Sequence, residues 1–141
     1  MPICVKYRSI FTPGTNDFTP PMPFLDVEIK GSRSSIGMPA LVDSGATSTV
    51  FPFGVDTEIG LECSSSCDVK GIGGKSELTR TKANLTILNG TMCLHRLKDC
   101  PIMVASQETQ LDFAILGRDT VFRLSRITFC EDIQEIWLKR C

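Results

Sequence analysis

An apolar run that ends on a carboxylate is the first feature of this sequence that could do chemistry. Residues 40–42 (ALV) lead directly into Asp43, and six small residues, SGATST, follow it. A buried strand gains nothing by ending on an unused charge, so Asp43 is a candidate catalytic acid or base. Asp, Ser and Gly also favour turns, and an ordinary turn would explain these residues taken alone.

Two further motifs follow this candidate loop along the chain. The first is glycine-rich, GIGG at residues 71–74, and the second is an apolar run that ends on glycine, AILG at residues 114–117, followed by Arg118. Together with Asp43-Ser44-Gly45-Ala46, they resemble the catalytic loop, the flap hairpin and the apolar-Gly element of retropepsin-like aspartic proteases. The resemblance extends over residues 24–130.

The resemblance implies an aspartic endopeptidase that acts as a homodimer on a polypeptide substrate. Two carboxylates a few ångströms apart cannot both ionise, so the pair shares one proton and supplies both the base and the acid of peptide hydrolysis. The chain has one Asp-Ser/Thr-Gly motif and, with 141 residues, no room for a second lobe. The second carboxylate would therefore come from a second chain across a two-fold axis.

The same resemblance assigns roles to individual residues. Asp43, Ser44 and Gly45 would be catalytic, with Ser44 bonding across the axis and Gly45 leaving backbone donors for the carboxylates. The residues expected to contact substrate are Ala46, Thr47, Gly71, Ile72, Gly73 and Gly74. Many viral members have an acid at the position of Thr47 that pairs with the arginine, so Arg118 needs another partner, Asp119 or a carbonyl.

The fold class follows from strand-like alternation along most of the chain. Apolar and polar residues alternate over 3–8, 25–30 and 82–87, a turn over 31–39 precedes the strand that ends on Asp43, and Asn89-Gly90 indicates a hairpin. Residues 12–23 are a proline-rich loop, 56–63 a helical turn, and a short amphipathic helix follows Gly117. We expect an all-β fold of one domain, residues 1–141: a small closed β-barrel-like single lobe with one short C-terminal-side helix.

Composition excludes several classes of function. The net charge of −1 gives no long-range attraction to nucleic acid or to an anionic membrane, and no apolar run could span a bilayer. Lys6 and Arg8 interrupt the N-terminal segment, which therefore has no signal-peptide core. The odd number of cysteines, seven, then favours reduced thiols in a cytoplasmic protein. We expect no cofactor.

Three motifs compete with this interpretation. Cys63, Cys67, Cys93 and Cys100 with His95 could surround zinc, but no pair has the common two-residue spacing, and we expect no metal site. Gly74-Lys75-Ser76 resembles the end of a phosphate-binding loop, but Val69 stands where its first glycine belongs. Asn84 and Asn89 match the glycosylation pattern, which matters only in an exported protein.

Two functional alternatives stay open at this point. The first is a catalytically silent peptide-binding or assembly module with the same fold. The second is a monomeric storage form that becomes active on dimerisation or trimming. The strand-like ends of the chain, ICVKYRSI and IQEIWLKR, are expected to help hold a dimer, and Trp137 is expected to pack in the core or at that interface.

Overall fold

The computed structural model describes residues 2–63, 65–71 and 74–141. Strands dominate it, as the alternation predicted, and two short helices, α1 (Val55–Ile59) and α2 (Val121–Leu124), interrupt them. The strands are β1 (Ile3–Lys6), β2 (Phe11–Thr12), β3 (Asp17–Phe18), β4 (Phe24–Lys30), β5 (Ser35–Val42), β6 (Val50–Phe51), β7 (Ser65–Gly71), β8 (Gly74–Asn89), β9 (Met92–Ala105), β10 (Ala114–Leu116), β11 (Ser125–Cys130) and β12 (Glu135–Arg140).

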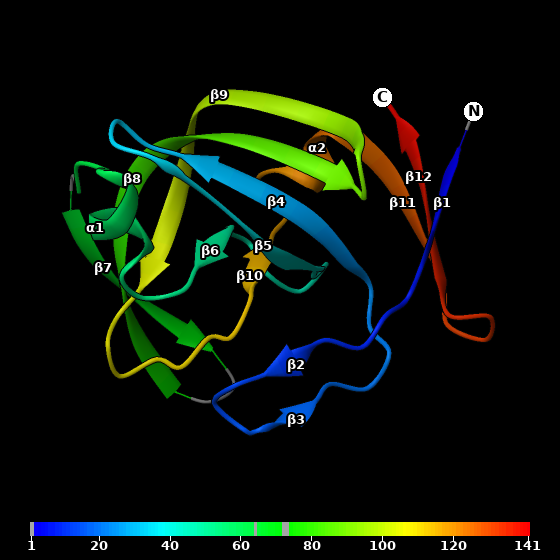
Figure 1. Ribbon diagram of the computed structural model, residues 1–141, viewed down its shortest axis with the longest axis horizontal. Helices are drawn as coiled ribbons and strands as arrows, with labels where there is room; N and C mark the ends of the chain where they lie inside the picture. Colours follow the sequence, from blue (N-terminus) through cyan, green and yellow to red (C-terminus); the bar gives the residue numbers. More distant parts are fainter. Residues whose placement is uncertain (1, 64, 72–73) are drawn as a thin grey trace.

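Six of these strands close into a barrel. The main sheet has the order β4-β5-β10-β6-β9-β8-β7, and an additional pairing of β4 with β8 joins its two sides, so that only β7 lies outside the closure. Figure 1 shows the barrel on the left, with β9 arching over it. Fully buried apolar side chains fill its interior, among them Ile29, Phe51, Leu85 and Ile87. The expected closed β-barrel is confirmed.

The predicted hairpin at Asn89-Gly90 is present and is longer than the sequence suggested. β8 and β9 pair from Leu78↔Ala105 to Asn89↔Met92, and Gly90 has a φ of 60°, which a residue without Cβ adopts freely. β5 likewise begins at Ser35, so most of the stretch expected to be a turn is strand. The additional strand residues in β5 and in the β8–β9 hairpin are polar or include proline. They form strands because neighbouring strands of the barrel pair with them.

A small hairpin interrupts the loop expected over residues 12–23. β2 and β3 pair through Phe11↔Phe18 and Thr12↔Asp17, and the two phenylalanine rings meet edge to face at 5.4 Å between centroids. The backbone N–H of Gly14, at the tip, donates to Asp112 Oδ1 at 3.2 Å. The hairpin is therefore attached to the segment that leads into β10.

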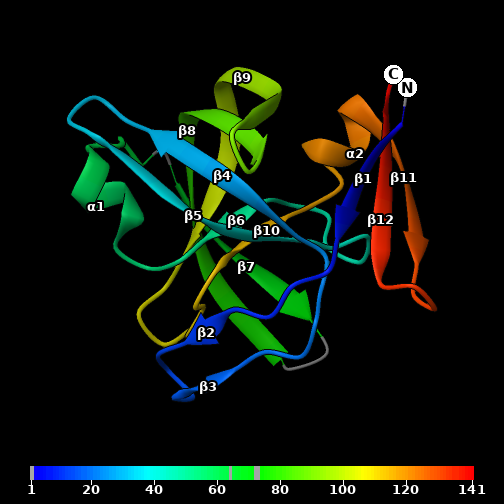
Figure 2. The same ribbon diagram turned by 45° about the vertical axis from the view of Figure 1, so that its right-hand side comes forward.

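The two ends of the chain form a second, three-stranded sheet with the order β1-β12-β11. β12 is its central strand, pairing with β1 through Cys4↔Trp137 and with β11 through Thr128↔Trp137. Figures 1 and 2 show this sheet beside the barrel, with both termini at one end. Ile136 and Leu138 are buried against the barrel, whereas Trp137 is 37% exposed on the outer face. Trp137 is therefore not a core residue.

Both helices are short, and the sequence predicted only α2 as a helix, with a helical turn at the place of α1. α1 is flanked by Gly54 and Gly60, both with positive φ, and Gly60 N–H bonds to the Asp56 carbonyl at 3.0 Å. Left-handed glycines at both ends limit the helix to little more than one turn. No helix in the described part of the chain is long and apolar enough to cross a membrane.

Polar contacts join the terminal sheet to the barrel. His95 of β9 lies 2.7 Å from the buried hydroxyl of Ser125 through its Nε2, and Arg140 donates to the Cys93 carbonyl at 3.1 Å. Burial, and secondarily the charge of Arg140, lowers the pKa of His95 below its usual 6.5. The junction is therefore built around a neutral imidazole.

Because His95 titrates at this junction, acid should lower the free energy of unfolding of the protein. Because its pKa is lower in the folded chain, the unfolded chain takes up a proton first as pH falls through about 6.5, and the free energy of unfolding decreases. We expect wild type to lose more stability than His95→Gln between pH 7 and pH 5, by urea denaturation at both pH values. Equal losses in the two proteins would show that His95 does not contribute to the destabilisation by acid.

Candidate functional site

The loop that begins at Asp43 is positioned by strands on both sides of β10. β5, which precedes the loop, lies parallel to β10 with Val42 opposite Leu116, and β6, which follows it, lies antiparallel with Val50 opposite Ile115. The Asp43 N–H donates to the Leu116 carbonyl at 3.1 Å, extending the β5–β10 ladder by one bond. The apolar-Gly element and the candidate catalytic loop are thus neighbours, as the resemblance implied.

A tight turn holds the Asp43 carboxylate. The Gly45 N–H donates to Asp43 Oδ1 at 2.9 Å, and the Ala46 N–H donates to the Asp43 carbonyl at 3.2 Å. The side chain is half-buried. Within the part of the chain that the structure describes, Oδ2 accepts no hydrogen bond. One oxygen is therefore oriented by the backbone, and the other is available to a water molecule or a second carboxyl group.

A buried hydroxyl network fixes the far end of the loop. Thr49 is fully buried; its Oγ1 accepts from the Gly117 N–H at 3.1 Å, donates to Asp119 Oδ1 at 2.9 Å and lies 2.8 Å from Thr120 Oγ1. The Arg118 N–H donates to the Ala46 carbonyl at 2.8 Å. These bonds attach residues 46–49 to the segment that links β10 to α2.

Sequence reasoning missed Thr49, Thr120 and this use of Asp119. Each threonine immediately precedes a valine that begins a strand or a helix, Val50 and Val121. That position beside buried elements is the one signal in the sequence that could have indicated buried hydroxyl groups. Their pairing joins residues 71 positions apart, and spacing alone does not reveal it.

The remaining loop residues face outward. Ser44, Gly45 and Thr47 are exposed, and Ala46 is half-buried. The structure thus brings all the loop residues singled out in the sequence together on one accessible turn. Exposed hydroxyl groups on either side of Gly45 are available to a second chain or to a peptide.

Gly71 and Gly74 of the glycine-rich stretch form the last pair of the β7–β8 hairpin that the structure describes. The two strands pair from Ser65↔Arg80 to Gly71↔Gly74, so the expected hairpin is present. Ile72 and Gly73 lie outside the described residues. In both views of the fold, the β7–β8 hairpin extends below the barrel (Figures 1 and 2).

The expected ion pair of Arg118 with Asp119 is not formed. The Arg118 side chain is exposed, and among the described residues its guanidinium has neither a carboxylate nor a carbonyl partner. Asp119 Oδ1 instead accepts the Thr49 hydroxyl. The prediction was wrong because Arg118 joins the loop through its backbone N–H and leaves its side chain in solvent.

The thiols offer no clear metal site. Within the described residues, no three or more His, Cys, Asp or Glu side chains are grouped as metal ligands. Burial and a hydrogen bond to Asp56 raise the pKa of Cys63 to about 11, and burial raises that of Cys100 to about 11. Since nucleophilic attack requires the thiolate, neither thiol is suited to act as a nucleophile at neutral pH.

Solved structures supply the comparison with known proteins. No protein-family model matches the sequence, and no curated protein matches it. The chain is similar to a retropepsin-like aspartic protease from Rickettsia conorii, with a TM-score of 0.62 and 13% identity over 98% of each chain. It is also similar to EIAV protease complexed with the inhibitor HBY-793, with a TM-score of 0.52 and 22% identity over 73% of this chain and 88% of that one.

The fold is therefore retropepsin-like, as the Asp43 loop, the glycine-rich stretch and the apolar-Gly element together predicted. At 13% and 22% identity, the likeness concerns the path of the backbone and leaves the chemistry to be argued from the site.

The contact between Gly117 and the loop generates a prediction. A Cβ at Gly117 would lie 2.5 Å from the Ser48 carbonyl oxygen and 2.6 Å from its carbon, both backbone atoms. Gly117→Ala must therefore displace the loop, and we expect it to lower the free energy of unfolding by about 2 kcal/mol or more. Urea denaturation measures the loss.

Gly37→Ala is the matched control, because the nearest atom to a Cβ there is the Val27 carbonyl oxygen, at 4.0 Å. On β5 this alanine should leave stability unchanged or raise it by up to about 1 kcal/mol. Equal effects of the two substitutions would show that loop and β10 segment are not in tight contact.

Proposed function

We propose that this chain is an aspartic endopeptidase that acts as a homodimer and hydrolyses peptide bonds with a water molecule bound between two copies of Asp43. The observation that carries the proposal is the state of the Asp43 carboxylate: one oxygen accepts the Gly45 N–H at 2.9 Å, and the other is available. The retropepsin-like fold supports it, since both neighbours named above are proteases.

The chemistry needs one proton shared by two carboxyl groups. The ionised Asp43 takes a proton from water as the water oxygen attacks the peptide carbonyl carbon, and the protonated Asp43 of the second chain donates its proton to the carbonyl oxygen. Proton transfer to the amide nitrogen then accompanies cleavage of the C–N bond. No metal and no cofactor is required in this scheme.

The other loop residues act by positioning. Ser44 is exposed and would bond across the two-fold axis to the partner's loop, while the Gly45 N–H keeps the Asp43 carboxylate in place. Ala46 and Thr47 would contact the substrate backbone on the side of the Asp43 loop. Gly71, Ile72, Gly73 and Gly74 would cover it from the β7–β8 hairpin, where glycine allows close approach.

A homodimer supplies the second carboxyl group, because the sequence has one Asp-Ser-Gly motif. The terminal strands remain candidates for the interface, but β12 uses both its edges within its own chain. A partner would meet the free edges of β1 and β11 or the outer face that carries Trp137. Deleting residues 133–141 would remove the buried Ile136 and Leu138, so it would test folding rather than dimerisation.

Replacing the carboxylate tests the proposal most directly. Asp43→Asn keeps the size of the side chain and an oxygen for the Gly45 N–H but provides no base, so cleavage of a mixed peptide library should fall by at least about 100-fold. Mass spectrometry of the products measures it. Asp99→Asn is the control: Asp99 is exposed with a φ of 49°, which asparagine tolerates, and its activity should match wild type.

Undiminished cleavage by purified, folded Asp43→Asn protein would exclude Asp43 as the catalytic group. If wild type itself cleaves no peptide although it is dimeric, the chain is better described as a peptide-binding or assembly module.

A shared proton also predicts how the rate varies with pH and with concentration. In acid both carboxyl groups are neutral and no base remains; in alkali both are charged and no acid remains, so the rate should be bell-shaped with an acidic optimum. Specific activity should rise with enzyme concentration until the dimer saturates. Initial rates across pH and dilution, with sedimentation to give the oligomeric state, measure both.

A flat pH profile would contradict the shared proton. Specific activity independent of dilution, in a protein that sediments as a monomer, would contradict the two-chain site.

A further inference from the structure

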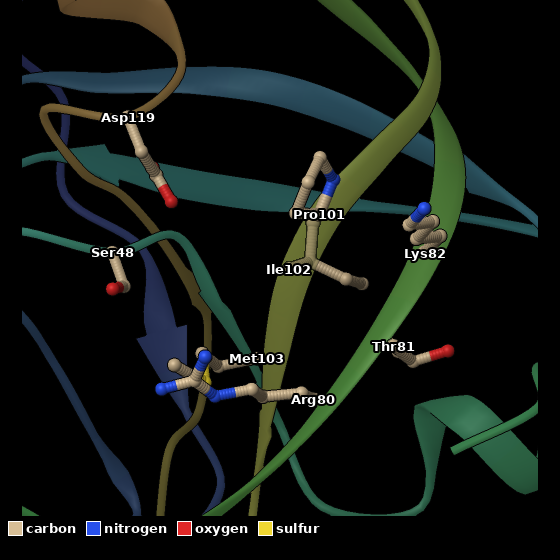
Figure 3. Close-up of a pocket in the computed structure, with 8 residues that line it drawn as sticks. All are labelled: Ser48, Arg80, Thr81, Lys82, Pro101, Ile102, Met103 and Asp119. Carbon is tan, nitrogen blue, oxygen red and sulfur yellow. The ribbon is translucent and has the colours of Figure 1, made fainter. Parts of the chain in front are cut away.

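A hollow of about 380 Å³ lies beside the end of the Asp43 loop. Figure 3 shows it between two walls: Ser48 and Asp119 come from one side, and β8 and β9 form the other. The residues that matter for its chemistry are Ser48, Arg80, Lys82, Pro101, Met103 and Asp119. Neither the proposed chemistry at Asp43 nor the motifs found in the sequence give this hollow a function.

Strand alternation gives the β8–β9 wall its character. Arg80 lies opposite Met103 and Lys82 opposite Pro101 in the ladder, so these four residues share the outer face of the barrel. Their neighbours Thr81 and Ile102 also line the hollow but are themselves buried. Two cations therefore stand over an apolar floor, and Figure 3 shows the Arg80 side chain reaching across β9 toward Met103.

The opposite wall is held by the network that fixes the loop. Ser48 directly precedes the fully buried Thr49, and Asp119 Oδ1 accepts the Thr49 hydroxyl at 2.9 Å. Among the described lining residues, the two cations of β8 outnumber the one carboxylate, Asp119, so their net charge is positive. An apolar floor with cations above it fits the methylene stem and the carboxylate of an acidic side chain.

The location relates the hollow to the substrate. Asp43 begins the loop and Ser48, which lines the hollow, ends it. In the proposed complex, a peptide extended over Ala46 and Thr47 would pass next to Ser48 and so reach the hollow. The two-fold axis of the proposed dimer places a second hollow at the same separation on the other side.

We propose that Arg80 and Lys82 make this hollow a binding site for an acidic side chain of the peptide substrate, at matching positions on both sides of the scissile bond. This inference rests on the proposed function and names the class of substrate. Arg80 also contacts other parts of the chain, so the proposal depends on its charge and position rather than on a vacant guanidinium.

Binding to the inactive Asp43→Asn protein separates this inference from catalysis. The probe is a synthetic library of apolar peptides that carry either Glu or the isosteric Gln at each position in turn, with affinity measured by fluorescence anisotropy. Glu should bind about 5-fold tighter than Gln, or more, at two symmetric positions, and salt should reduce the difference.

Variants at the hollow identify the residues responsible. Arg80→Met and Lys82→Met, each combined with Asp43→Asn, should reduce the preference for Glu, and Arg80→Glu should shift it toward peptides with Lys at the same positions. Lys98→Met is the matched control, because Lys98 is an exposed cation of β9 that does not line the hollow. It should retain the full preference.

Equal binding of the Glu and Gln peptides, no binding of either, or a preference for Lys in the protein with the native hollow would each overturn the inference. So would a Glu preference that survives in Arg80→Met and Lys82→Met. Failure of the proposed function shows separately, as absence of cleavage by the wild-type enzyme in the presence of selective Glu binding.

Discussion

The hydroxyl group of Thr49 is the contact on which the candidate site depends. It accepts the Gly117 N–H, donates to Asp119 and lies 2.8 Å from the Thr120 hydroxyl, in a position without solvent. Each such bond contributes about 1 kcal/mol, but removing the hydroxyl group would leave the buried Gly117 N–H unsatisfied, at a cost of about 1–3 kcal/mol. The loop, β10 and α2 are therefore joined at one buried atom.

This junction explains why β10 stands between the strands on either side of the loop. β5 brings the chain to Asp43 and β6 takes it away, and each pairs with β10. Gly117 directly follows β10, where a side chain would collide with the Ser48 backbone, so the close approach requires glycine. The carboxylate of Asp43 is thus oriented by backbone groups that have little freedom to move.

Local pattern in the sequence predicted much of this fold, and long-range pairing was what it could not predict. Alternation and Asn89-Gly90 indicated the strands and the β8–β9 hairpin because both depend on neighbouring residues. The motif order indicated the loop and its contact with β10. The pairing of β1 with β12 inside one chain, the Thr49–Thr120 contact and the solvent-exposed Arg118 side chain depend on tertiary positions, which spacing does not encode.

Asp119 connects the two parts of the site and sets a limit on how each can vary. Its carboxylate lines the charged hollow and also accepts the Thr49 hydroxyl, so a substitution there alters the hollow and the support of the loop together. Arg80 and Lys82 lie on β8, and their side chains are exposed. A change at either can alter the charge of the hollow while the buried network stays intact. In the proposed peptidase, the β8 side of the hollow can therefore vary independently, whereas the Asp119 side is constrained because it supports the Asp43 loop.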